Sequence, residues 1–137
     1  MTNQFGAGHP PHAALVDAYL SSLANGRITS WSCRRCARAR IPVLTSCPWC
    51  GERSAPEVHA SSGTGTVWSF CTFHKSYLAD FDPPYVVAVI ELNNGVRLIS
   101  ALSLASPGDI YIGMPVRARE TNPSDPRLIF VPTKRKD

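Results

Sequence analysis

Four cysteines in two closely spaced pairs constrain this chain more than any other feature of its sequence. Their order is Cys33-x2-Cys36-x10-Cys47-x2-Cys50, and Gly51 follows the last of them. Two such pairs let two tight turns present four thiolates to one ion, which is the closed tetrahedral arrangement of a structural zinc site. Iron is the alternative metal, because four thiolates bind it as well. The competing interpretation is two disulfides in a secreted protein, and nothing else in the sequence supports secretion.

The cysteine segment is too short to bury a hydrophobic core of its own. Residues 27–53 form the predicted zinc ribbon, which needs its metal for stability. Residues 54–62 follow as a predicted linker. The chain of 137 residues then leaves 63–133 for a small β-barrel, with a basic tail at 134–137.

Residues 1–26 are predicted to form a tail followed by one helix. The helix should run from about His12 to Ala24, after two prolines and before Asn25-Gly26. Its apolar side chains share one face, which makes it a candidate partner-docking helix; they are Leu15, Val16, Tyr19, Leu20 and Leu23. Packing across this chain's own ribbon is the alternative, and the sequence leaves both open.

From Gly63 onwards the pattern changes to short strands separated by turn residues. Asn94-Gly95 predicts a hairpin with a type I′ turn. Five strands are expected, at residues 64–74, 85–92, 96–104, 116–121 and 127–132. This number and size are typical of the five-stranded Greek-key barrel known as the OB-fold. The predicted fold class is therefore mainly β, with an N-terminal helix, a zinc ribbon and an OB-fold barrel.

The clearest predicted strand, residues 85–92, is apolar on both faces. Val87 and Val89 fall on one face, while Val86 and Ile90 fall on the other. A barrel strand with a wet outer face would alternate apolar and polar residues. The outer face is therefore expected to be covered by the ribbon, by the helix or by another protein.

The order of these motifs resembles one protein family. After the cysteine pairs come Ser62-Gly63-Thr64-Gly65-Thr66-Val67, Pro83-Pro84 ahead of the strand at 85–92, Gly95-Val96-Arg97-Leu98, and Ile112-Gly113-Met114-Pro115-Val116. Over nearly the whole chain this is similar to the OB-fold proteins with a rubredoxin-like zinc ribbon, the family called domain of unknown function thirty-five. Relatives often have glycine directly after the first cysteine pair, where this chain has Ala37, so we expect slight strain in that turn.

The resemblance implies a non-catalytic accessory subunit within a hetero-oligomer. Such a subunit docks on a thiolase-fold enzyme, which can be a thiolase, an acyltransferase or a retro-aldolase acting on acyl-CoA. It stabilises that partner and helps shape the acyl-CoA site, while the partner carries the catalytic residues. An enoyl-CoA hydratase-like protein is the other partner that the resemblance implies. The implied cofactors are structural zinc and acyl-CoA shared with the partner.

The remaining candidate site residues surround the loop after the first barrel strand. OB-folds commonly bind ligands at such a loop. Its candidate contacts to CoA or to a partner are His74, Lys75, Tyr77, Phe81 and Tyr85. A surface loop anchored by its own aromatic rings is an equally good interpretation. Cys71, the fifth cysteine, lies between aromatic residues and is expected to be a buried structural side chain. No catalytic residue is predicted.

The formal net charge of +4 raises single-stranded nucleic-acid binding as a second function class. That function needs stacking aromatics on a basic face. Arginines around the cysteine pairs would offset a negative zinc–thiolate centre, and the barrel itself is nearly neutral, so this class is the less favoured one. The sequence shows no signal peptide and no apolar run of about 18 residues, so a cytoplasmic location without membrane contact is expected.

Overall fold

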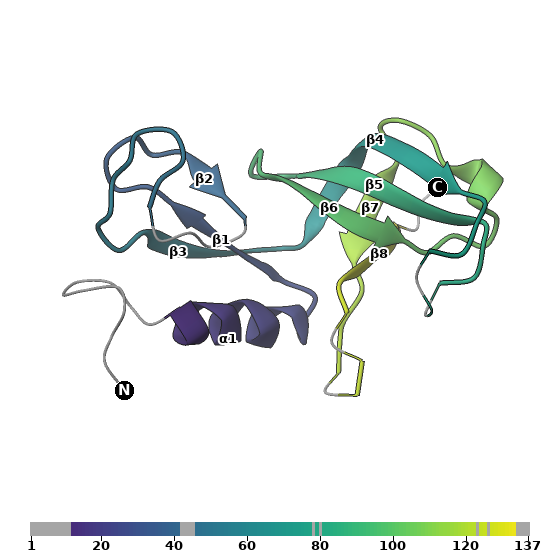
Figure 1. Ribbon diagram of the computed structural model, residues 1–137, viewed down its shortest axis with the longest axis horizontal. Helices are drawn as coiled ribbons and strands as arrows, with labels where there is room; N and C mark the ends of the chain where they lie inside the picture. Colours follow the sequence, from purple (N-terminus) through teal and green to yellow (C-terminus); the bar gives the residue numbers. More distant parts are fainter. Residues whose placement is uncertain are drawn as a thin grey trace.

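The elements follow one another in the order helix, ribbon and barrel (Figure 1). The computed structural model describes residues 12–41, 46–77, 79, 81–122, 124–125 and 127–133, with side chains from residue 16 onwards. Strands β1, β2 and β3 form a sheet in the order β2-β1-β3, and strands β4 to β8 form a closed barrel in the order β4-β5-β6-β8-β7. The predicted fold class is confirmed.

Helix α1 spans His12–Leu23 and ends where the sequence predicts. The Arg27 N–H donates to the Ser22 carbonyl at 3.0 Å, and the Gly26 N–H donates to the Leu23 carbonyl at 3.0 Å. This pair of bonds is the Schellman motif, which requires the left-handed backbone that Gly26 adopts at φ +68°. The helix has 12 residues, and no helix in the described part of the chain is long and apolar enough to cross a membrane.

The ribbon sheet uses a strand that the sequence did not predict. Strand β1 (Ile28–Ser32) pairs with β2 (Ala39–Arg40) on one edge and with β3 (Glu57–Ser61) on the other. The segment 54–62, predicted as a linker, therefore contains a strand, because β3 pairs the second edge of β1 through five residues. The sequence also predicts that residues 41–44 form the second arm of the ribbon, but residues 42–45 lie outside the described ones.

The five barrel strands match the predicted ones within a few residues. They are β4 (Thr64–Phe73), β5 (Tyr85–Leu92), β6 (Arg97–Leu102), β7 (Pro115–Ala118) and β8 (Ile129–Pro132). A 3₁₀ helix, η1 (Pro107–Asp109), lies between β6 and β7.

The hairpin between β5 and β6 is confirmed, but its predicted turn type is wrong. A type I′ turn needs positive φ at two residues, whereas Gly95 has φ +86° and Asn94 is not among the described residues with positive φ. The Gly95 N–H donates to the Leu92 carbonyl at 2.8 Å, and the Leu92 N–H donates to the Val96 carbonyl at 2.8 Å. These bonds describe a three-residue loop that closes on a glycine in the left-handed region.

Helix, ribbon and barrel share one hydrophobic core. The inward side chains of β5, such as Val86 and Ile90, are buried, and the same cluster includes Leu23 of α1 and Ile28 of β1. A Cβ on Gly63 would overlap the Gly26 carbonyl oxygen, so glycine is required where the start of the barrel crosses the end of the helix. The Leu23 carbonyl accepts a further bond from the Thr121 N–H at 3.2 Å, which ties the helix to the barrel.

Candidate metal centre

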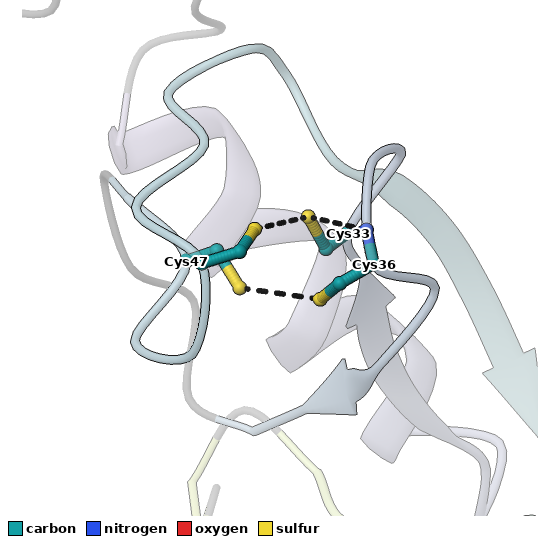
Figure 2. A group of neighbouring side chains, drawn as sticks. Cys33, Cys36 and Cys47 are labelled. Carbon is teal, nitrogen blue, oxygen red and sulfur yellow. Dashed lines mark hydrogen bonds between the residues drawn. The ribbon is translucent and has the colours of Figure 1, made fainter.

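The two cysteine pairs form equivalent tight turns, which we call the first and second knuckle. In the first, the Ala37 N–H donates to the Cys33 carbonyl at 2.9 Å; in the second, the Gly51 N–H donates to the Cys47 carbonyl at 2.9 Å. The Cys33 N–H and the Cys47 N–H also bond alike, to the carbonyl five residues further on at 2.9 and 2.8 Å. Figure 2 shows that the sulfur atoms of the two knuckles face each other.

Ala37 carries the strain expected in the first knuckle. Its φ is +65°, and it is the one residue other than glycine with positive φ in the described part of the chain. The matching position in the second knuckle is Gly51, with φ +78°. An L-residue with a Cβ meets steric repulsion in this region, whereas glycine does not.

The sulfur geometry fits a four-coordinate metal. The Sγ atoms of Cys33, Cys36, Cys47 and Cys50 all lie within 4.8 Å of one another. Two of these distances, Cys33 to Cys50 and Cys36 to Cys47, are 3.6 Å. Zinc–sulfur bonds of about 2.3 Å in a tetrahedron place sulfur atoms about 3.8 Å apart, whereas a disulfide bond is about 2.05 Å long. The cluster therefore has the size of a metal site, and the disulfide interpretation does not fit it.

Hydrogen bonds from backbone N–H groups favour the thiolate form of these cysteines. The Cys36 N–H at 3.5 Å and the Arg35 N–H at 3.4 Å reach the Cys33 sulfur, and they lower the pKa of that thiol. Burial raises the pKa of Cys47, but hydrogen bonds from the N–H groups of Cys50 and Trp49, together with those of the neighbouring thiols, outweigh it and bring the pKa to about 6. Thiolates that accept such bonds are suited to bind a metal cation.

The pKa of the Cys50 thiol shifts in the opposite direction. The Glu52 N–H lowers its pKa, but burial and the neighbouring thiols of Cys33 and Cys47 raise it more, to about 11. Like charges this close cannot all ionise without compensation. A bound dication would supply it, so the donor set fits zinc or iron.

Two arginine side chains connect the first knuckle to neighbouring segments. Arg34 Nε donates to the Ala55 carbonyl at 2.7 Å, and its Nη1 lies 3.4 Å from a Glu57 carboxylate oxygen. The Arg38 guanidinium lies 5.5 Å from the centre of the Trp49 ring, which joins the first knuckle to the second.

Some of the apolar residues predicted on the helix face pack inside the protein, and others lie nearer the surface. Tyr19 stacks on Trp31 of β1 with ring centres 6.3 Å apart, and Leu23 is 1% exposed in the core. The Thr29 hydroxyl reaches the Ser22 hydroxyl at 2.9 Å. The helix thus packs across its own ribbon, which is one of the two alternatives that the sequence left open. Val16 is half-buried and Leu20 is exposed, while the side chain of Leu15 lies outside the described ones.

The loop between β4 and β5 is held by its own aromatic rings. Tyr85 stacks on Phe73 at 5.0 Å and contacts Phe81 at 5.4 Å, while the Lys75 ammonium lies 5.9 Å from the centre of the exposed Tyr77 ring. His74 is exposed. Phe81 and Tyr85 come together, whereas Lys75, Tyr77 and His74 lie nearer the solvent.

A groove of about 280 Å³ next to Phe81 and Tyr85 brings in two residues that the sequence did not single out. They are Arg119 and Arg127, which follow β7 and precede β8. Both pair with the carboxylate of Asp125, at 3.9 and 2.8 Å. No local pattern marks them, because they reach the groove through the pairing of distant strands.

The prediction that Cys71 is buried is wrong. Its side chain is exposed, because Cys71 pairs with Val87 in the register that places both on the outside of the barrel. Trp68, at which the register shifts between Val67 and Ser69, follows the buried Val67 and lies at the surface, where 49% of it is exposed.

Comparisons with known proteins agree with this architecture. The family model described as the ChsH2 C-terminal OB-fold domain matches residues 58–120. A probable enoyl-CoA hydratase alpha subunit from Thermomonospora curvata is 40% identical over 90 residues, which are 66% of this chain and 28% of that protein. A DUF35 domain-containing scaffold protein from Methanocaldococcus jannaschii is 35% identical over 88 residues, 63% of this chain and 62% of that protein.

A solved structure covers more of the chain. It is a chain of the Ltp2-ChsH2(DUF35) aldolase, similar at a TM-score of 0.69 and 32% identity over 85% of this chain and 92% of that one. The fold and the cysteine cluster define this chain as an OB-fold protein with a cysteine-rich ribbon of the zinc-ribbon type. The chain belongs to the DUF35 family.

Proposed function

We propose that this chain is a non-catalytic accessory subunit of an enzyme that processes acyl-CoA. Its partner in this proposal is a thiolase-fold enzyme, with an enoyl-CoA hydratase-like protein as the alternative. The observation that carries the proposal is the similarity to 92% of a chain of an aldolase assembly. Relatives called a scaffold protein and a hydratase alpha subunit support the same role.

In this proposal the four cysteines bind a structural zinc ion, with iron as the alternative. Four sulfurs within 4.8 Å of one another complete a tetrahedral coordination, which leaves no position for a substrate. The metal would hold the two knuckles together. Since Ile28 of β1 and Leu23 of α1 pack in the hydrophobic core, a well-ordered ribbon would also stabilise the core. The metal thus acts on stability rather than on chemistry.

The loop between β4 and β5 is the proposed contact to acyl-CoA or to the partner near its active site. Lys75 and Tyr77 offer a cation and an aromatic ring at the surface. Such a pair suits a phosphate and an adenine ring, respectively. Phe81 and Tyr85 hold the loop in place, and His74 lies at its start.

Affinity purification of the tagged chain from its native cell tests this function. The expected result is an acyl-CoA-processing enzyme in near-stoichiometric amount, whose identity also decides between a thiolase-fold and a hydratase-like partner. Recovery of nucleic acid without an enzyme, released as the salt concentration rises, would instead support the single-stranded nucleic-acid alternative.

A further inference from the structure

The outer face of the barrel retains an apolar centre that neither the ribbon nor the helix covers. We define this outer face by Trp68 on β4, Val87 and Val89 on β5, and Ile99 on β6. Val89 pairs directly with Ile99 across the sheet. Ile99 is 73% exposed and Trp68 is 49% exposed, whereas the two valines are half-buried. The coverage expected from the sequence is therefore incomplete within the described chain.

One edge of this face deepens into a groove. The groove holds about 470 Å³ and is lined by residues that include Tyr19 of α1, Tyr85 and Val87 of β5, Ile99 of β6 and Leu128 ahead of β8. It therefore joins the helix to the barrel surface. Because these elements share one core, the groove is preformed and needs little ordering when a partner enters it.

At each end of the outer face, an arginine side chain lies over an aromatic ring. At one end the Arg97 guanidinium lies 4.1 Å from the centre of the Trp68 ring and bonds to Glu91 at 2.9 Å. At the other end the Arg127 guanidinium lies 5.4 Å from the centre of the Phe81 ring. Trp, Tyr and Arg are the residues enriched among those that dominate binding energy at protein interfaces.

The two ends differ in charge. Arg97 and Glu91 form a neutral pair. Arg127 and Arg119 both pair with the Asp125 carboxylate, so these three side chains carry a net positive charge. A surface that docks here with electrostatic complementarity presents an apolar side chain to Ile99 and a carboxylate to the Arg127 end.

We propose that the outer face and its groove are the surface on which the enzyme partner docks, with an apolar projection of the partner on Ile99 and an acidic residue of the partner beside Arg127. This inference rests on the proposed accessory function and adds the contact surface to it. A nucleic acid would need basic residues along the whole face, whereas the centre here is apolar and one end is neutral.

The test compares two isoleucine variants of the full chain for binding to the purified enzyme that the wild-type chain captures. Ile99→Asp should raise the dissociation constant at least about 30-fold, which is typical of a dominant interface residue. The matched control is Ile112→Asp: Ile112 is 60% exposed on the loop before β7, outside the groove. It should bind within about 3-fold of wild type. Both variants should retain the metal content and unfolding midpoint of wild type, because both side chains are exposed.

A second substitution tests the positive charge at the Arg127 end of the outer face. Arg127→Gln should weaken binding and reduce the dependence of the association rate on salt concentration, because a screened charge pair is removed. Glutamine keeps a hydrogen-bonding side chain of similar length at this position. An unchanged salt dependence would contradict the acidic partner residue.

The possible outcomes distinguish a wrong docking surface from a wrong proposed function. If wild type captures the enzyme and Ile99→Asp binds as tightly as Ile112→Asp, the docking surface is wrong while the accessory function stands. If both variants lose binding equally, the effect is not specific to this face and the inference is again overturned. If wild type captures no enzyme, the proposed function itself fails. If purified wild type forms a dimer that Ile99→Asp dissociates, a second copy of this chain occupies the face instead.

Discussion

Replacing Ala37 with glycine should stabilise the first knuckle. The left-handed conformation at φ +65° costs a residue with a Cβ roughly 1–2 kcal/mol. Glycine removes that cost but gains freedom in the unfolded chain, which offsets about 0.4–1 kcal/mol. Ala37 is exposed, so losing its methyl group removes little burial. The expected net gain in the free energy of unfolding is about 0.5–1 kcal/mol.

The second knuckle provides the matched control for this change. Gly51 has φ +78°, and a Cβ built on it would meet nothing within 4 Å. Gly51→Ala therefore introduces local backbone strain without a clash with residues beyond its chain neighbours, and it should destabilise the ribbon by about 0.5–1 kcal/mol. The two substitutions thus test the same conformational cost with opposite signs.

Thermal unfolding of the metal-loaded protein and metal transfer to a chelator measure both variants. For a chain of this length the midpoint should rise by about 2–4 °C in Ala37→Gly and fall by a similar amount in Gly51→Ala. Because metal binding is coupled to ribbon folding, transfer to the chelator should slow about 2- to 5-fold in the first variant. A lower midpoint for Ala37→Gly would refute the assigned backbone conformation of the knuckle.

Three further predictions follow from the site and the core. Cys50→Ser should lose the metal and unfold the ribbon, whereas Cys71→Ser, which changes an exposed side chain, should keep the metal content of wild type; elemental analysis per chain measures both. Gly63→Ala should destabilise the protein by about 2 kcal/mol or more in denaturant unfolding, because its Cβ would overlap a backbone carbonyl, and an unchanged midpoint would count against this crossing. The hydrogen bond from Arg127 lowers the pKa of Asp125 below 3.8, so this carboxylate contributes stability that is present above pH 3.8 and is lost as the pH falls through the lowered pKa. The stability difference between wild type and Asp125→Asn should accordingly shrink over that acidic range, and a constant difference would contradict the pairing.

Features encoded locally were predictable from the sequence. The spacing of Cys33, Cys36, Cys47 and Cys50 predicts two knuckles, because each turn is closed by hydrogen bonds within five residues. The barrel strands follow from short runs of β-branched and aromatic residues, and Gly26 marks the helix end by its left-handed conformation.

Features that depend on distant partners were not predictable. Strand β3 forms because the second edge of β1 pairs with it, and no strong strand pattern marks Glu57–Ser61. The exposure of Cys71 depends on a register shift in β4, which a single sequence does not reveal. The groove that contains Arg119 and Arg127 depends on the way β7 and β8 close the barrel.

The native mass of the complex recovered with the wild-type chain tests whether this chain is an accessory subunit of an acyl-CoA-processing enzyme. We expect one species that contains this chain and an acyl-CoA-processing enzyme in a fixed ratio, with one zinc or iron ion for each copy of this chain. A chain that carries its metal but is recovered alone, under conditions where the enzyme is present and intact, would contradict it.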